Sequence, residues 1–267
     1  MHKVKLFDTH CHLDMVKSAE IAIQRANRKG VKSFLVPAVH KRNFSLVKKI
    51  AQENKTVFYV LGIHPCFVET SELTDLVALE LEIQRCLRDK KFLGIGEIGI
   101  DFFRKDLDKQ KMEFFFDAQL QLAEKYRVPV VMHIRKAQDR VLKYYRKYTL
   151  TGGLAHAFTG SPTQLTNFLK EGILLGFGGT LTYDRSTRIR NLFQLVPDHG
   201  YVLETDSPDM SPSWSEKNDQ NTPENLLGIA EVAARLRSST VEKIANLTSR
   251  NMNRVFPRLA LLRDGNV

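Results

Sequence analysis

Six side chains that commonly bind metal ions are predicted to lie at or just beyond the ends of β-strands. They are His10, His12, Glu97, His133, His156 and Asp206. Imidazole nitrogens and carboxylate oxygens are ligands for divalent cations. Gathered in one pocket, such a set could hold a pair of cations and activate a water molecule. The set therefore predicts a metal-dependent hydrolase.

His10 and His12 form a His-x-His motif after the first predicted strand. In an extended chain, side chains two residues apart point the same way, so both imidazoles could share one cation. An isolated motif of this kind is more often explained by buried histidines that donate to carbonyls. Asp8 is expected to hold the N–H of one of these histidines or to cap a helix.

Glu97 follows an apolar strand and has glycines on both sides, at positions 96 and 99. A buried carboxylate is costly unless its charge is compensated. Glu97 could bridge two cations through its two oxygens; the alternative is a salt bridge to an Arg or Lys inside the fold. Asp101, four residues later, is expected to orient a loop.

Polar residues also close later apolar segments. His133 and His156 each end one, so the pocket must supply their partners. Asp206 ends the last segment and could both bind a cation and accept the proton of the attacking water. Glu204, two residues earlier on the same side, is expected to contact the substrate or to support a ligand.

Two further residues are predicted to contact the substrate. His64 closes the third strand and is assigned to the substrate or a water rather than to a metal. Arg135 follows His133 by two residues and could bind a phosphate. The alternative for Arg135 is an ion pair with Asp101 or Asp139.

Eight short, β-branched segments could position these residues. They are residues 4–7, 33–37, 57–62, 92–95, 130–133, 153–156, 173–176 and 201–204. Segments of helical period alternate with them, at residues 18–29, 43–53, 73–90, 109–126, 138–147, 163–170 and 188–195. This alternation is typical of a parallel sheet with helical crossovers.

The number of strands and the length predict an α/β fold of the (β/α)8 TIM-barrel type, as in metal-dependent hydrolases. An open doubly wound sheet is the alternative, but it would usually show a Gly-rich first turn. Two extra helices are expected at residues 224–235 and 241–255, and residues 1–267 are expected to form one domain. Residues 207–221 are expected to form part of a lid, in which Trp214 stacks a base or simply packs.

Composition narrows the function class. No P-loop, nucleophile elbow or dinucleotide fingerprint is present, so covalent catalysis is not expected. The beginning of the chain lacks the apolar segment of a signal peptide, no apolar run approaches the ~20 residues of a membrane span, and the three cysteines form no Cys-x-x-Cys pair. A cytoplasmic protein without membrane contact is expected.

The formal charge of +10 favours a polyanionic partner such as nucleic acid.

Taken together, these motifs resemble the TatD family of metal-dependent deoxyribonucleases, among the amidohydrolase-like barrels, and most closely its YjjV-like branch. The matching segments are Asp-Thr-His-Cys-His at 8–12, Gly-Ile-His-Pro at 62–65, Gly-Glu-Ile-Gly-Ile-Asp at 96–101, His-Ile-Arg at 133–135, His-Ala-Phe-Thr-Gly at 156–160, Gly-Gly-Thr at 178–180 and Glu-Thr-Asp-Ser-Pro at 204–208. Any one of them is weak, but in this order they cover most of the chain.

The resemblance implies two divalent cations, Mg²⁺, Mn²⁺ or Zn²⁺. One would be held by His10, His12, Glu97 and Asp206, and the other by Glu97, His133 and His156. The implied substrate is DNA, as single strands or 3′ ends, with no obligate protein partner. Asp206 and Glu97 are the expected catalytic residues.

Two other functions stay open at this point. The same barrel could act as an esterase, lactonase or deacylase, including a D-aminoacyl-tRNA deacylase, with the same cations but a narrower pocket. A catalytically idle nucleic-acid-binding protein is the third possibility, and the complete ligand set opposes it.

Overall fold

A single parallel sheet forms the centre of the computed structural model, which describes residues 4–216 and 219–259. Neighbouring strands follow one another in chain order, and each neighbouring pair is parallel. The strands are β1 (Leu6–Asp8), β2 (Val31–Pro37), β3 (Val57–Leu61), β4 (Phe92–Asp101), β5 (Val130–Arg135), β6 (Gly153–Ala155), β7 (Ile173–Phe177) and β8 (Tyr201–Leu203).

Hydrogen bonds between the segments that follow β1 and β8 close the sheet into a barrel. The Thr9 amide donates to the carbonyl oxygen of Leu203 at 3.3 Å, and the Thr9 hydroxyl donates to the same oxygen at 3.0 Å. The Asp206 amide donates to the carbonyl oxygen of His10 at 2.9 Å. The predicted (β/α)8 barrel is therefore confirmed.

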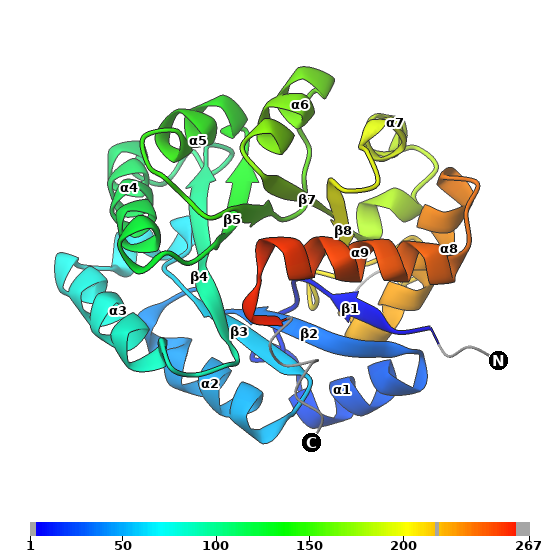
Figure 1. Cartoon of the computed structure of the whole chain (residues 1–267), viewed down its shortest axis with the longest axis horizontal. Coiled ribbons are helices and arrows are strands. Elements are labelled where there is room, and N and C mark those ends of the chain that lie inside the picture. The colour runs from blue at the N-terminus through cyan, green and yellow to red at the C-terminus, as the bar shows by residue number, and fades with distance from the viewer. Residues whose placement is uncertain (1–3, 217–218, 260–267) are drawn as a thin grey trace.

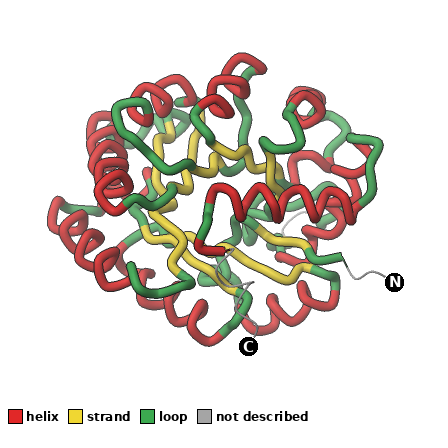
Figure 2. The backbone as a smooth tube through the Cα atoms, viewed as in Figure 1, coloured by secondary structure: helices red, strands yellow, loops and turns green. Residues whose placement is uncertain are grey.

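Helices surround the barrel, as Figure 2 shows in red around the yellow strands. They are α1 (Ala19–Arg28), α2 (Phe44–Glu53), α3 (Leu73–Cys86), α4 (Lys109–Tyr126), α5 (Gln138–Tyr145), α6 (Pro162–Lys170) and α7 (Thr187–Leu195), followed by α8 (Leu226–Leu236) and α9 (Val241–Val255). Short 3₁₀ helices are η1 (Lys41–Asn43), η2 (Pro65–Thr70), η3 (Gly179–Thr182) and η4 (Pro223–Asn225). The two extra C-terminal helices are present as predicted.

Alternating strand residues face two separate cores, because successive side chains in a strand point to opposite faces. In β3, Val57, Tyr59 and Leu61 pack in the cluster under the helices. Phe58 and Val60 belong instead to the cluster inside the barrel. Burial on both faces explains why the strands read as continuous apolar runs.

Helix α9 crosses one end of the barrel (Figure 1). Met252, Val255, Phe256 and Leu259 of this segment join the interior cluster. The Arg258 guanidinium donates to the carbonyl oxygen of Phe92, the first residue of β4, at 3.0 Å. The covered end is therefore the amino end of the strands, and the carboxyl ends lie at the opposite end.

The fourth strand is longer than predicted. Residues 92–95 were expected, whereas β4 continues to Asp101 with a register shift between Ile95 and Ile98. The glycines and the carboxylate here are typical of a loop, but pairing with β5 keeps the segment extended. Glu97 therefore lies within a strand rather than after it.

No helix in the described part of the chain has the length and apolar character to cross a membrane.

Candidate metal centre

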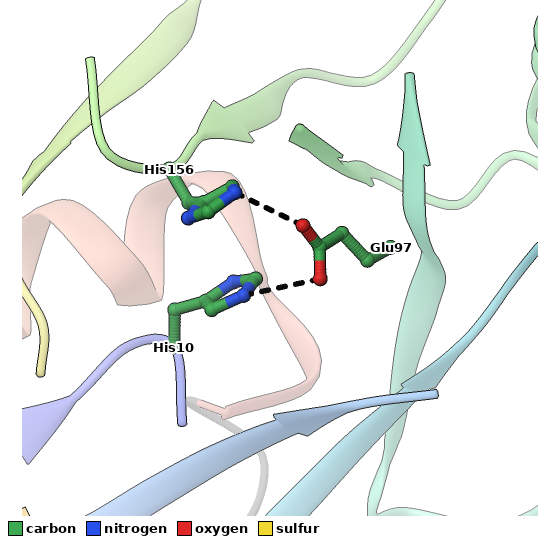
Figure 3. A group of neighbouring side chains, drawn as sticks. All are labelled: His10, Glu97 and His156. Carbon is green, nitrogen blue, oxygen red and sulfur yellow. Dashed lines mark ion pairs between the residues drawn. The ribbon is translucent and has the colours of Figure 1, made fainter. Parts of the chain in front are cut away.

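The six predicted ligands meet at the carboxyl end of the barrel. His10 and His12 follow β1, His156 follows β6 and Asp206 follows β8, whereas Glu97 and His133 project from β4 and β5. Five strands, β1, β4, β5, β6 and β8, thus position the six residues, and closure of the barrel brings them together. Figure 3 shows the stacked rings of His10 and His156, with Glu97 at their edge and each of its oxygens paired with one ring.

The two carboxylate oxygens of Glu97 face different histidines. Its Oε2 lies 3.3 Å from His10 Nε2 and 3.5 Å from His12 Nε2. Its Oε1 lies 2.9 Å from His156 Nε2 and 3.2 Å from His133 Nδ1. The alternative of a salt bridge to Arg or Lys is wrong, because the ion-pair partners of Glu97 among the described residues are all histidines.

Asp206 completes the His10 side of the centre. Its Oδ1 lies 3.5 Å from His10 Nε2 and 3.7 Å from His12 Nε2. His10, His12 and Asp206 present donor atoms close enough together for one ion. His10, Glu97 and His156 form a second such group.

Unpartnered ring nitrogens indicate that these residues fit a metal. Both ring nitrogens of His10 and Nδ1 of His12 are buried without a hydrogen-bond partner. Such atoms are rare in folded proteins, and each usually has an explanation such as an ion. Imidazoles and carboxylates are ligands that suit Mn²⁺ and Zn²⁺.

Burial and neighbouring charges shift the pKa values of the histidines in the centre. Burial, together with the neighbouring His156, lowers the pKa of His10 to about 3, so this ring is neutral and free to ligate. Burial opposes a charge on His156, but Glu97 and Asp206 raise its pKa to about 10. The carboxylates thus attract a positive charge, which a cation supplies in place of the proton.

Asp101 supports His133 from behind. His133 Nε2 lies 3.2 Å from Asp101 Oδ2. The other oxygen of Asp101 accepts the amide N–H groups of Phe103 at 2.9 Å and Arg104 at 3.3 Å. Asp101 therefore orients a loop as predicted, and it also fixes a ring that the sequence did not link to it.

Glu204 is completely buried beside His156. Its Oε1 accepts the Ala157 amide at 2.5 Å and lies 3.9 Å from His156 Nδ1. A methyl group at Gly176 would overlap the Glu204 carboxylate, so this glycine provides the space. Burial raises the pKa of Glu204 to about 8. A group without exposure does not contact substrate, so of the two expectations the supporting position holds.

Comparison with known proteins gives the family. A family model described as TatD related DNase matches residues 7–257. The chain belongs to the TatD family. It is therefore a metal-dependent hydrolase, the class of enzyme that its predicted ligands indicated, and the resemblance is confirmed.

Individual relatives resemble the chain over its length. The metal-dependent hydrolase YjjV of Escherichia coli is 32% identical and covers 94% of this chain and 98% of its own. The crystal structure of YjjV, a TatD homolog, superposes with a TM-score of 0.89 over the same shares. TATDN3 of Mus musculus is 29% identical, over 96% of this chain and 90% of its own. A mutant PTE-like lactonase of Deinococcus radiodurans, 13% identical with a TM-score of 0.64, covers 95% of this chain and 96% of its own and shares the fold alone.

The hydrogen-bond partners of Asp8 in this TatD barrel differ from those predicted. It was expected to hold a histidine N–H or to cap a helix, but it instead accepts the Thr205 amide at 2.9 Å and the Thr205 hydroxyl at 2.6 Å. Burial, opposed by these hydrogen bonds, raises its pKa to about 7. The prediction was wrong because Thr205 is adjacent only through closure of the barrel.

Arg135 lies at the mouth of the TatD centre. Its guanidinium carbon lies 3.7 Å from the centre of the Phe103 ring. Among the described residues it forms no ion pair with Asp101 or Asp139, so that alternative is wrong. Arg135 lines a cavity of about 440 Å³ together with His133 and Asp206.

Part of the predicted lid borders the same cavity. Asp209 and Met210 line it, and the Asn221 amide holds this segment by donating to the carbonyl oxygen of Thr205 at 2.7 Å. Trp214 Nε1 donates to Asn225 Oδ1 at 3.0 Å, and its ring lies against α8. Of the two roles considered for Trp214, lid packing is the one observed.

His64 lies closer to the ligands than expected. Its Nε2 is 3.2 Å from Glu97 Oε1, next to His133. A second depression of about 320 Å³, lined by His12, His64 and Arg135 among others, exposes this side of the centre. The sequence signals for this position were the end of the third strand and the Gly-Ile-His-Pro motif.

Proposed function

We propose that this TatD-family hydrolase cleaves phosphodiester bonds in DNA with two divalent cations. The main support for this proposal is the position of the Glu97 carboxylate. One of its oxygens faces His10 and His12, and the other faces His133 and His156. His10, His12, Glu97 and Asp206 would hold one cation, and Glu97, His133 and His156 the other. Mn²⁺, Zn²⁺ and Mg²⁺ are the candidates.

When bound, such cations lower the pKa of a water molecule and neutralise charge on phosphoryl oxygens. The chain itself supplies the proton acceptor. Asp206 borders the cavity, and its carboxylate is held at the centre by the barrel-closing segment. Burial raises the pKa of Asp206, which makes it a better base than an exposed aspartate.

The position of Arg135 is further evidence for an anionic substrate. Its guanidinium is exposed, stacked on Phe103 and free of carboxylate partners among the described residues. A planar guanidinium in this position can bind a phosphate with two hydrogen bonds. The net charge of +10 favours a polyanion that extends beyond the pocket, and we infer single strands or 3′ ends as the substrate form.

The test is release of nucleotides from 3′-labelled single-stranded DNA by protein with measured metal content. Metal-dependent release that disappears in Glu97→Ala is expected. Arg135→Gln should keep its metals and raise KM more than it lowers kcat, because a phosphate contact at the mouth acts in binding. A parent protein that holds both cations and releases nothing from any DNA would refute the proposal and direct the search to esters and acyl-tRNA.

A further inference from the structure

Two neighbouring histidines approach the same oxygen of Glu97. His64 Nε2 and His133 Nδ1 each lie 3.2 Å from Glu97 Oε1. Their ring centres are 4.4 Å apart, with an interplanar angle of 67°. By position alone, His64, Glu97 and His133 form a group that could hold one ion. The second nitrogen of each ring separates their roles.

In His133, the second nitrogen faces a carboxylate. Its Nε2 lies 3.2 Å from Asp101 Oδ2, and a carboxylate accepts hydrogen bonds. The ring proton therefore lies on Nε2, and the lone pair of Nδ1 is directed to the centre. A histidine whose far nitrogen donates to a carboxylate is the usual arrangement of a metal ligand.

In His64, the second nitrogen faces a donor. Its Nδ1 accepts the backbone N–H of Cys66 at 3.1 Å, as the N-cap of η2. An amide N–H only donates, so Nδ1 carries no proton. A neutral imidazole must then carry its proton on Nε2, the nitrogen that faces Glu97. A protonated Nε2 has no free lone pair for a cation.

We propose that His64 is a neutral hydrogen-bond donor to the reacting oxygens, and not a metal ligand. Its Nε2 lies 3.2 Å from Glu97 Oε1 and borders the depression lined by His12 and Arg135, so a phosphoryl or attacking oxygen that enters there would come within reach of this N–H. A fixed donor aimed at developing negative charge is among the largest contributions to catalysis. This role rests on the proposed function; the tautomer itself rests on the Cys66 contact.

Two substitutions of His64 distinguish its role as the N-cap of η2, through Nδ1, from its proposed role as a hydrogen-bond donor, through Nε2. Asparagine at His64 can still accept the Cys66 N–H, since Asn is a preferred N-cap, but it does not reach the Nε2 position. Glutamine can place an amide N–H near that position but caps poorly. His40 is the matched control, because its Nδ1 caps η1 by accepting the Arg42 N–H at 3.1 Å.

Metal content and turnover are measured on the same preparations. His64→Asn is expected to bind two cations with the affinity of the parent, while kcat falls about 10²–10³-fold, as for loss of one oxyanion donor. His64→Gln should recover most of that loss, and His40→Asn should match the parent in both. His133→Ala should lose the second cation. If His64→Asn also loses a cation, or if its kcat is unchanged, the proposal is overturned.

A spectroscopic readout needs no substrate. In ¹⁵N-histidine protein loaded with ¹¹³Cd²⁺, His64 Nε2 should couple to its own proton, whereas His133 Nδ1 should couple to cadmium. Cadmium coupling at His64 Nε2 would overturn the proposal. A parent that cleaves no DNA would refute the proposed function instead, and this spectrum would still decide between donor and ligand.

Discussion

At Glu97, a buried carboxylate faces His10 and His12 with one oxygen and His133 and His156 with the other. Such a residue works only if the rings around it are held in fixed orientations. The His133 ring is held in this way by Asp101, and such a group behind a candidate ligand affects metal affinity as much as the ligand itself. Two predictions test this at the scale of single residues.

Asp101→Asn should weaken the second cation site. The substitution removes the charge that fixes the His133 ring, and loss of such a partner typically lowers metal affinity about 10–100-fold. Titration with Zn²⁺ should show a lower affinity at the site that includes His133 and an unchanged affinity at the site of His10 and His12. Asp106→Asn, in the same loop but exposed and paired with Arg104, is the control. Equal affinities for parent and variant would show that Asp101 only orients the loop.

Glu204→Gln should stabilise the metal-free protein at high pH. Because its folded-state pKa of about 8 lies above the ordinary 4.5, the folded state binds this proton more tightly than the unfolded state. The stability this provides is complete below pH 4.5 and is lost as the pH rises to 8. Thermal unfolding above pH 8 should favour the variant by on the order of 5 kcal/mol, with little difference near pH 4.5. The exposed Glu231→Gln control should show no such trend, and a pH-independent difference for Glu204→Gln would contradict the account.

At the scale of elements, the segments after β1 and β8 form the junction on which the centre depends. They carry His10, His12 and Asp206, and the pair of hydrogen bonds from Thr205 to Asp8 joins them. The junction is short: β1 and β8 have three residues each. Side-chain contacts therefore supply part of the closure that backbone pairing provides elsewhere in the barrel.

Thr205→Val should loosen this junction. The substitution removes the hydroxyl donor and leaves a buried carboxyl oxygen without its partner, which costs about 1–3 kcal/mol. Urea unfolding of the metal-free protein measures the loss, and the affinity of the first cation should fall with it. Thr166→Val, an exposed hydroxyl on α6, is the control. If both variants unfold alike, the Asp8–Thr205 contact does not support the closure.

The sequence located the candidate ligands better than it located their surroundings. A polar residue that ends an apolar strand, such as His156 or Asp206, is visible locally, because period and composition define the strand. The partner of Asp8 is not visible, since Thr205 lies almost 200 positions away. The place of Glu97 inside β4 depends on pairing with β5, and the tautomer of His64 depends on one backbone amide.

At the scale of the whole molecule, the two ends of the barrel have different tasks. The amino end is filled by apolar side chains and covered by α9. The carboxyl end carries the buried polar groups of the centre and the cavities beside it. Stability and chemistry are thus largely separated along the barrel axis, as is general for this architecture.

Phe256→Ala tests that separation. Phe256 is fully buried in the interior cluster, and truncating such a ring typically costs about 3–5 kcal/mol. Denaturant unfolding should show that loss, while metal stoichiometry and kcat at low temperature should stay close to the parent. A variant that remains folded but loses a cation would show that α9 also shapes the centre.

The most direct test of the central claim is a titration of metal-free protein with Mn²⁺, in which bound metal and nucleotide release from single-stranded DNA are measured together. The account predicts little release with one cation bound, a steep rise as the second binds, and neither second binding nor release in Glu97→Ala. Full release with one cation, or none with two, would contradict a two-cation nuclease centred on Glu97.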